Sequence, residues 1–177
     1  KYIQGVYLCS KKKIMFSVVV PVFNSEDIFP DLYFRLNKVM TSLDKNYELI
    51  LIDDCSSDNS WEIIQRIHDK DKKVKTIQLT KNFGQHNALM CGFHHARGRF
   101  IVTMDDDLQH PPEEIPKLIK KVSEGYKVVY GQYKEKKHYW FRNFGSRLVN
   151  KLLTRVMGNK VNVTSFRIID NSVVDVI

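Results

Sequence analysis

Three apolar runs constrain the fold of this chain more than any other feature of its sequence. They lie at residues 16–22 (FSVVVPV), 47–52 (YELILI) and 100–104 (FIVTM). Apolar runs rich in β-branched residues, with little polar–apolar alternation, are typical of strands that are buried on both faces of a sheet. We therefore expect a central sheet with helices packed on each side.

Helical patterns separate these runs. The expected helices lie at about residues 26–43, 59–68, 85–96 and from 111 onward. Two further short strands are expected at 74–79 and 127–130. Strands that alternate with helices form βαβ units, which predicts a single α/β domain with a mostly parallel central sheet flanked by helices. The 177 residues suffice for one such domain, expected at 15–177 after a lead-in segment or tag at 1–14.

Polar residues follow the apolar runs where the strands should end. Asn24 follows the first run, Asp53 and Asp54 follow the second, and residues 105–107 (DDD) follow the third. In α/β sheets, ligands bind beyond the carboxyl ends of the strands, so these residues are candidates for one shared site. The sequence has neither the glycine-rich dinucleotide fingerprint nor the Walker pattern, so a bound diphosphate would need another source of positive charge.

The three aspartates at 105–107 indicate a divalent cation. Their mutual repulsion raises at least one pKa unless a cation lies beside them, and a hard divalent ion prefers oxygen ligands. Asp105 and Asp107 are two residues apart, so an extended strand end points them the same way while Asp106 points elsewhere. An acidic turn before the next helix explains the same run without a metal. The aspartates at 53–54 fit either turn chemistry or hydrogen bonds to a base or ribose.

The net charge of +8 is concentrated in one segment. Between Lys134 and Lys160 there are eight basic residues and one acid, Glu135, a net +7 that leaves +1 for the rest of the chain. A nucleic-acid-binding domain would spread its charge more widely, so we expect no nucleic-acid partner. Residues 138–157 have the pattern of an amphipathic basic helix, suited to an anionic membrane surface or a phosphate-bearing ligand. A solvated basic face explains several of these charges, but Arg142 lies within or beside the apolar arc and needs an anionic partner.

Three of these motifs together resemble a known family. The segments PVFN at 21–24, DD at 53–54 followed by SSD at 56–58, and DDDLQHPPEE at 105–114 resemble glycosyltransferase family 2, which has the GT-A fold, a Rossmann-like nucleotide-diphospho-sugar transferase domain. Further segments resemble the polyprenyl-phosphate branch, in particular bacterial undecaprenyl-phosphate 4-deoxy-4-formamido-arabinose transferases and dolichyl-phosphate mannose synthases. They are NFGQHNALMCGF at 82–93, EEIPKLIKKVSEGYKVV at 113–129 and WFRNFGSRLVNKLL at 140–153. The resemblance covers about residues 15–177.

The resemblance implies a donor site. Asp105 and Asp107 would hold Mg²⁺ or Mn²⁺ against the diphosphate, with Gln109 as a further ligand. Asp54 would bind the uracil ring and Asp53 would brace the loop. The residues expected to bind the nucleotide are Pro21, Val22, Phe23, Asn24, Glu26, Asp53, Asp54 and Asp106.

The resemblance also implies an acceptor site. Arg142, Ser146 and Arg167 match positions that bind the acceptor phosphate, and the catalytic set would be Asp105, Asp107 and Arg142. Two features depart from the family pattern: Asp106 replaces the usual alanine, and residues 159–164 lack the usual glycines.

The expected function is the inverting, metal-dependent transfer of a sugar from a UDP-sugar to a polyprenyl (undecaprenyl) phosphate for cell-envelope biogenesis. The expected place is the cytoplasmic face of the bacterial inner membrane, with a C-terminal membrane region beyond residue 177 and a homo-oligomer left open. One alternative is a family 2 glycosyltransferase with a soluble or glycan acceptor. Another is a non-catalytic nucleotide-binding module. A response-regulator receiver also clusters aspartates at strand ends, but its adjacent pair follows the first strand rather than the second.

Overall fold

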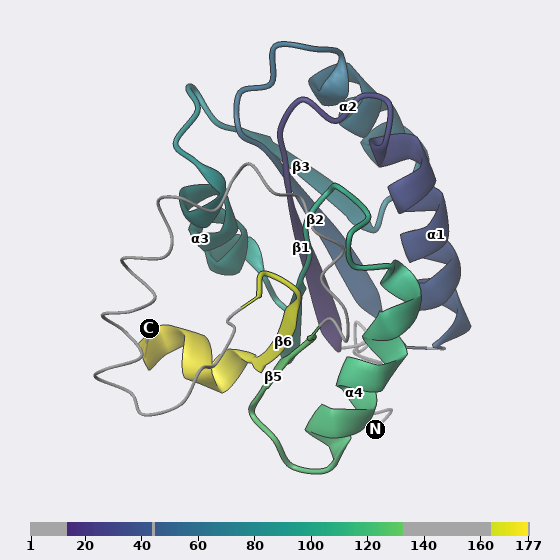
Figure 1. Ribbon diagram of the computed structural model, residues 1–177, viewed down its shortest axis with the longest axis vertical. Coiled ribbons are helices and arrows are strands. Elements are labelled where there is room, and N and C mark those ends of the chain that lie inside the picture. Colours follow the sequence, from purple (N-terminus) through teal and green to yellow (C-terminus); the bar gives the residue numbers. More distant parts are fainter. Residues whose placement is uncertain (1–13, 44, 133–163, 177) are drawn as a thin grey trace, which may run out of the picture.

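A single six-stranded sheet forms the centre of the computed structural model, which describes residues 14–43, 45–132 and 164–176. Its strand order is β3-β2-β1-β4-β6-β5 (Figure 1). β1 pairs in parallel with β2 and β4, β2 pairs in parallel with β3, and β6 runs antiparallel to both β4 and β5. The mostly parallel sheet predicted from the sequence is therefore confirmed. The strands are β1 Phe16–Val22, β2 Tyr47–Asp53, β3 Val74–Gln78, β4 Phe100–Thr103, β5 Val128–Tyr130 and β6 Arg167–Asp170.

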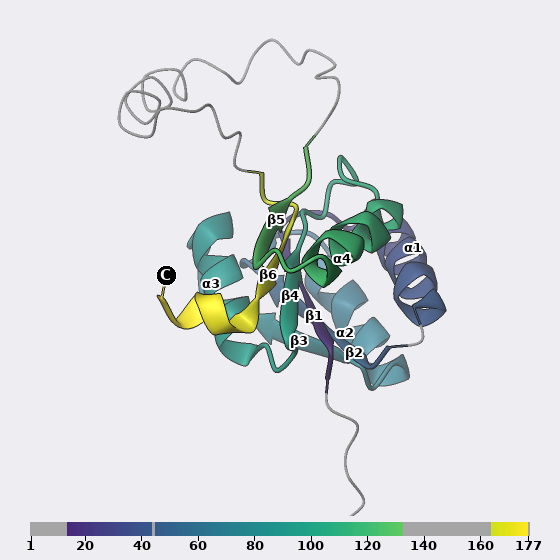
Figure 2. The same cartoon turned by 90° about the horizontal axis from the view of Figure 1, so that it is seen from below.

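Helices cover both faces of the sheet, as expected (Figure 2). The elements α1, α2 and α4 pack on one face, while α3 and the 3-10 helix η2 lie on the other. The bounds are α1 Phe29–Ser42, α2 Ser60–Lys70, α3 Gln85–His95, α4 Ile115–Ser123, η1 Pro112–Glu114 and η2 Asn171–Val176. In the described residues, no helix combines the length and apolar character needed to cross a membrane.

The two faces explain the continuous apolar sequence of β1. All seven of its residues are buried. Val18 and Val20 belong to the core beneath α1 and α4, whereas Val19 belongs to the core beneath α3. Because successive side chains point to opposite faces, a strand covered on both sides needs an apolar residue at nearly every position.

Helix α3 lies unusually close to the sheet at Gly92. A Cβ atom added there would lie 2.3 Å from Val19 Cγ1 and 2.9 Å from Ile52 Cδ1. Glycine therefore sets the distance between α3 and the strands. The N-terminus of α3 reaches the carboxyl edge of the sheet, so this packing also positions residues at that edge.

A buried polar cluster closes the amino edge of the sheet. Glu48 in β2 accepts hydrogen bonds from Ser17 Oγ (2.7 Å) and from the Arg97 N–H (2.7 Å), and its Oε2 lies 2.5 Å from Lys75 Nζ. Burial alone would raise the pKa of Glu48, but the bonds from Lys75, Ser17 and the Arg97 N–H outweigh it, so the pKa lies below its usual value. A Cβ on Gly98 would lie 2.5 Å from the Ser17 nitrogen, so glycine is needed where this connection crosses β1.

Two features differ from the sequence expectation, and two expected segments cannot be compared with the structure. Strand β6 was not anticipated: residues 167–170 insert antiparallel between β4 and β5. Helix α1 begins at Phe29 rather than near residue 26, because Pro30 in its first turn has no N–H to donate to the Glu26 carbonyl oxygen. All but the last residue of the lead-in expected at 1–14, and the whole basic helix expected at 138–157, lie outside the described residues.

Candidate functional site

Parallel pairing brings the polar strand ends to one edge. Val22 at the end of β1 is in register with Asp53 at the end of β2, and Val19 is in register with Thr103 at the end of β4. The loops that follow β1, β2 and β4 therefore meet, as the topology rule for α/β sheets predicts. Backbone strain gathers at the same place, since Asn24, Cys55 and Leu108 have φ values of 51°, 61° and 57°.

Asn24 and Glu26 connect the loop after β1 to the loop after β2. The Asn24 side-chain oxygen accepts the Ser57 N–H at 2.8 Å. Glu26 Oε2 accepts both the backbone N–H (2.9 Å) and the side-chain amide (2.6 Å) of Asn59. These two predicted nucleotide-binding residues thus shape the edge of the site. Pro21 and Val22 are buried in β1, and the Phe23 ring is exposed.

Asp53 holds the turn after β2. Its side chain is fully buried and accepts the Ser56 N–H at 3.3 Å on each carboxylate oxygen, and Gln78 Nε2 at 3.2 Å. The carboxylate supplies the acceptors that a tight turn cannot supply from its own backbone. This geometry agrees with a bracing role.

Asp54 connects β2 to the entrance of α3. Its two carboxylate oxygens accept the N–H groups of Phe83 and Gly84, each at 2.8 Å, and only 3% of the residue is exposed. Gly84 has a φ of 87°, a conformation that favours glycine. A uracil N–H would have to share an oxygen that already accepts a backbone donor. The predicted contact with the base stays a prediction.

Asp105 lies at the centre of the carboxyl edge. Its Oδ1 accepts the side-chain amide of Gln85 at the start of α3, and its Oδ2 accepts the hydroxyl of Ser165 before β6. Burial raises the pKa of Asp105, and the charges of Asp107 and Asp106 raise it further, against the opposing effect of the two hydrogen bonds. A cation placed here would relieve that repulsion. Sequence reasoning missed Gln85 and Ser165 as partners of this carboxylate.

The other two aspartates have different surroundings. Asp106 Oδ2 accepts the Phe23 N–H at 3.0 Å and contacts the Ser25 hydroxyl, and burial is the main cause that raises its pKa. Asp107 is exposed and its Oδ1 accepts the Gln109 N–H at 2.9 Å. Asp106 therefore does not share the hydrogen-bond partners of Asp105 or Asp107, and the expectation that Asp105 and Asp107 point the same way stays a prediction.

The donor set can be tested against a divalent ion. No group of three or more His, Cys, Asp and Glu side chains suited to a metal occurs among residues 14–43, 45–132 and 164–176. Mg²⁺, however, is commonly held by one or two carboxylates together with substrate phosphates and water. The charges of Asp107 and Asp106 raise the pKa of Asp105, which a cation shared with a diphosphate would relieve, and the assignment of Asp105, Asp107 and Gln109 as its ligands stays a prediction.

Two contacts fix the segment that follows the aspartates. The buried ring of His110 stacks on Phe166 with centroids 4.8 Å apart, and burial lowers its pKa. Arg35 of α1 makes a bidentate ion pair with Glu113, at 3.0 and 2.7 Å. These contacts hold the 105–114 motif between α1 and the start of β6.

Arg167 is the member of the predicted acceptor set that the structure describes. It opens β6 opposite Thr103, and its guanidinium carbon lies 5.9 Å from the centroid of the Phe93 ring. Its Nε is buried and has no hydrogen-bond partner among the described residues. The arginine therefore lies near the end of β4 with donor capacity to spare. Arg142 and Ser146 lie outside the described residues.

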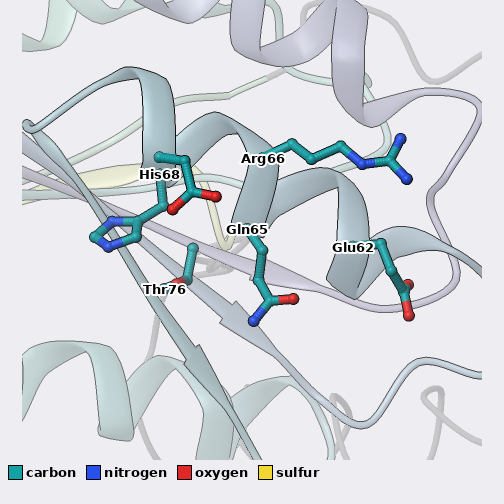
Figure 3. Close-up of a pocket in the computed structure, with 6 residues that line it drawn as sticks. Glu62, Gln65, Arg66, His68 and Thr76 are labelled. Carbon is teal, nitrogen blue, oxygen red and sulfur yellow. The ribbon is translucent and has the colours of Figure 1, made fainter.

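A separate pocket of about 290 Å³ lies away from the strand ends, between α2 and β3 (Figure 3). Gln65 on α2 and Thr76 on β3 line it together with Glu62, Arg66, His68 and Asp69. His68 Nδ1 is 2.7 Å from the Val74 carbonyl oxygen. This pocket is open and polar and does not include any of the strand-end aspartates.

The model of the family described as glycosyl transferase family 2 matches residues 17–174 of the chain. Solved structures of similar fold include S. aureus TarS 1-349 in complex with UDP-GlcNAc, with a TM-score of 0.62 and 19% identity over 92% of this chain and 47% of that one. Another is glucosyl-3-phosphoglycerate synthase from Mycobacterium tuberculosis in complex with Mn²⁺, UDP and glucosyl-3-phosphoglycerate. Its TM-score is 0.64, with 17% identity over 98% of this chain and 64% of that one.

A third similar structure is the mannosyltransferase PcManGT from Pyrobaculum calidifontis in complex with GDP-Man and Mn²⁺. Its TM-score is 0.58, with 18% identity over 70% of this chain and 37% of that one. The chain thus spans less than two thirds of the length of each of these three proteins. At such identities the likeness supports the fold, and the family match supplies the membership.

Proposed function

The chain belongs to glycosyl transferase family 2, and from that premise we propose that it transfers a sugar from a UDP-sugar to a polyprenyl phosphate with the help of Mg²⁺ or Mn²⁺. One observation carries the donor half of the proposal. The Asp105 carboxylate meets the entrance of α3 and the start of β6 at the same edge where the loops after β1 and β2 converge. That edge offers carboxylates for a cation beside a loop suited to a nucleotide.

The metal site would consist of Asp105, Asp107 and Gln109. When bound, the ion would act as a Lewis acid that stabilises the negative charge of the departing diphosphate. The chain's own residues keep Asp105 in place through Gln85 and Ser165. Three solved structures of the same fold support a nucleotide sugar and a divalent ion as partners of this site. They contain UDP-GlcNAc, UDP with Mn²⁺, and GDP-Man with Mn²⁺.

The transfer is a single displacement. An oxygen of the acceptor phosphate forms a bond to the anomeric carbon, the bond from that carbon to the diphosphate oxygen breaks, and UDP leaves with the electron pair. The anomeric configuration inverts. A phosphate is already anionic near neutral pH, so the protein needs to orient it and stabilise the leaving group rather than supply a strong base.

Two observations support a polyprenyl phosphate as acceptor. The segments at 82–93, 113–129 and 140–153 resemble that branch of the family, and the segment between 134 and 160 carries a net +7 that suits an anionic surface. Arg167, with a buried Nε that lacks a partner among the described residues, is a candidate phosphate ligand beside the end of β4. We propose that the reaction takes place at the cytoplasmic face of a membrane.

A soluble or glycan acceptor is the second candidate. It is favoured by the similar fold of the synthase that was solved with glucosyl-3-phosphoglycerate. A soluble acceptor such as 3-phosphoglycerate bears a phosphate as the lipid does, so contacts from Arg167 do not separate these two acceptors. The lipid does.

The experiment compares acceptors with the full-length protein in detergent or vesicles. A panel of labelled UDP-sugars is offered with undecaprenyl phosphate, with 3-phosphoglycerate, and with no acceptor. We expect label to enter the lipid fraction only with undecaprenyl phosphate and Mn²⁺ or Mg²⁺. Label that enters only a water-soluble product would favour the second candidate and contradict the lipid proposal. Arg167→Lys should lower lipid transfer at least tenfold while UDP binding is retained, because lysine cannot make two parallel hydrogen bonds to a phosphate.

A further inference from the structure

The loop after β1 is held almost entirely by side chains of other segments. The backbone N–H groups of four consecutive residues, 23 to 26, all donate to side-chain oxygens. Three of these acceptors come from the loop after β2 and from α2. They are Ser56 Oγ at 3.1 Å, Ser60 Oγ at 2.8 Å and Asp58 Oδ2 at 3.1 Å.

The fourth acceptor comes from the opposite side of the site. Asp106 Oδ2 accepts the Phe23 N–H at 3.0 Å across 83 residues of sequence. The same oxygen contacts the hydroxyl of Ser25, which also lies 3.1 Å from the Phe23 carbonyl oxygen. Asp106 is thus the residue of the 105–107 run that bonds to the loop after β1.

The adjacent aspartates do not share this contact. Asp105 bonds to Gln85 and Ser165, and Asp107 bonds to the Gln109 N–H. A carboxylate oxygen that already accepts a backbone N–H and meets a hydroxyl has less capacity left for a cation than the exposed Asp107. Within the run, Asp106 therefore bonds to the loop after β1, whereas Asp105 and Asp107 are the residues that the proposed function assigns to the ion.

We propose that Asp106 is a positioning residue that ties the loop of residues 23–26 to the metal-pair segment, so that the nucleotide and the ion meet a preassembled site. The inference rests on the proposed function, in which this loop borders the nucleotide. Asp106 acts through hydrogen-bond acceptance, because Phe23 N–H and Ser25 O–H are both donors and neither requires a negative charge.

Two substitutions separate acceptance from charge. Asp106→Ala removes the acceptor, whereas Asp106→Asn keeps an acceptor oxygen and removes the charge. Binding of UDP in the presence of Mn²⁺ is measured by calorimetry with the full-length protein. We expect Asp106→Ala to weaken binding about tenfold, as the loss of its hydrogen bonds to the Phe23 N–H and the Ser25 hydroxyl predicts, and Asp106→Asn to recover most of that loss. Asp69→Ala, an exposed change on α2, is the matched control.

Ser25→Ala tests the same contact from the other side. If the two residues act through one contact, the Asp106→Ala/Ser25→Ala double variant should lose less affinity than the sum of the single losses. Equal weakening by Asp106→Ala and Asp106→Asn would show that the charge matters, as for a metal ligand, and would overturn the proposal. Unchanged binding in Asp106→Ala would also overturn it.

A measurement without nucleotide keeps this inference apart from the proposed function. Amide hydrogen exchange of the free protein should speed up at residues 23–26 in Asp106→Ala, and stay close to wild type in Asp106→Asn. Wild-type protein that fails to bind UDP with Mn²⁺ would contradict the proposed function alone. Exchange that is the same in wild type and Asp106→Ala would refute the positioning role whatever the nucleotide result.

Discussion

Replacing Asp54 by asparagine tests whether this carboxylate holds the entrance of α3. In the folded protein its two oxygens accept the Phe83 and Gly84 N–H groups at 2.8 Å each. An asparagine side chain has one acceptor oxygen and one NH₂ group. One backbone N–H would then face a donor instead of an acceptor, and the other would lose its charge-assisted bond.

The expected loss of stability follows from these two contacts. A hydrogen bond to a charged group contributes about 1.5–3 kcal/mol and a neutral one about 0.5–1.5 kcal/mol. Because only 3% of Asp54 is exposed, water has little room to replace the lost acceptor. Losing one charged bond and weakening the other predicts a destabilisation of about 2–4 kcal/mol, or a fall of about 5–15 °C in the melting temperature of a domain of this size.

Urea and thermal unfolding of the protein without nucleotide measure this effect. Asp69→Asn makes the same chemical change at an exposed residue of α2 and should alter stability by no more than about 0.5 kcal/mol. If Asp54→Asn unfolds at the wild-type midpoint and only its UDP affinity falls, the carboxylate serves the base rather than the turn. That outcome would refute the structural reasoning given for Asp54.

Three further substitutions should change stability in directions that the structure predicts. The folded-state pKa of Glu48 lies below the ordinary value of 4.5, so its ionised form stabilises the fold above about that pH, and this contribution is lost as the pH falls through the folded pKa. Between pH 7 and pH 3, Glu48→Gln should therefore lose less stability than the wild type in urea titrations, and an equal loss would contradict this. Gly92→Ala should lower the melting temperature, since overpacking against Val19 and Ile52 costs about 1–3 kcal/mol and helix propensity returns only about 1, and a rise would count against it. Cys55→Gly should raise stability by about 0.5–1 kcal/mol in the same assay, because φ is 61° there; a decrease would argue that Cys55 makes an unrecognised contact.

The sequence predicts the central strands because their burial is local information. β1 and β2 are covered on both faces, so nearly every position is apolar and the runs are visible without knowledge of their neighbours. The convergence of the loops after β1, β2 and β4 then follows from parallel topology alone. This is why the edge of the candidate site could be named from the sequence.

β6 and the partners of the aspartates could not be predicted in this way. The strand has four residues, and its burial depends on insertion between β4 and β5 rather than on a long apolar run. The Asp54 contacts span 29 and 30 residues and depend on how α3 approaches the sheet at Gly92. The two-residue spacing distinguishes Asp106 from Asp105 and Asp107 only along an extended strand, and β4 ends at Thr103. The spacing carries no signal for the bond to the Phe23 N–H.

A calorimetric titration of UDP into the full-length protein, with Mn²⁺ and again with a chelator, tests whether a divalent ion assists diphosphate binding at the strand ends. Asp107→Ala is measured beside the wild type, with Asp69→Asn as the exposed-carboxylate control. We expect that UDP binds with Mn²⁺ and that the chelator weakens binding. Asp107→Ala should weaken binding at least tenfold without a change in melting temperature, while Asp69→Asn should leave it unchanged. UDP binding that is equally strong with the chelator, or in Asp107→Ala, would contradict a metal-assisted diphosphate site at the strand ends.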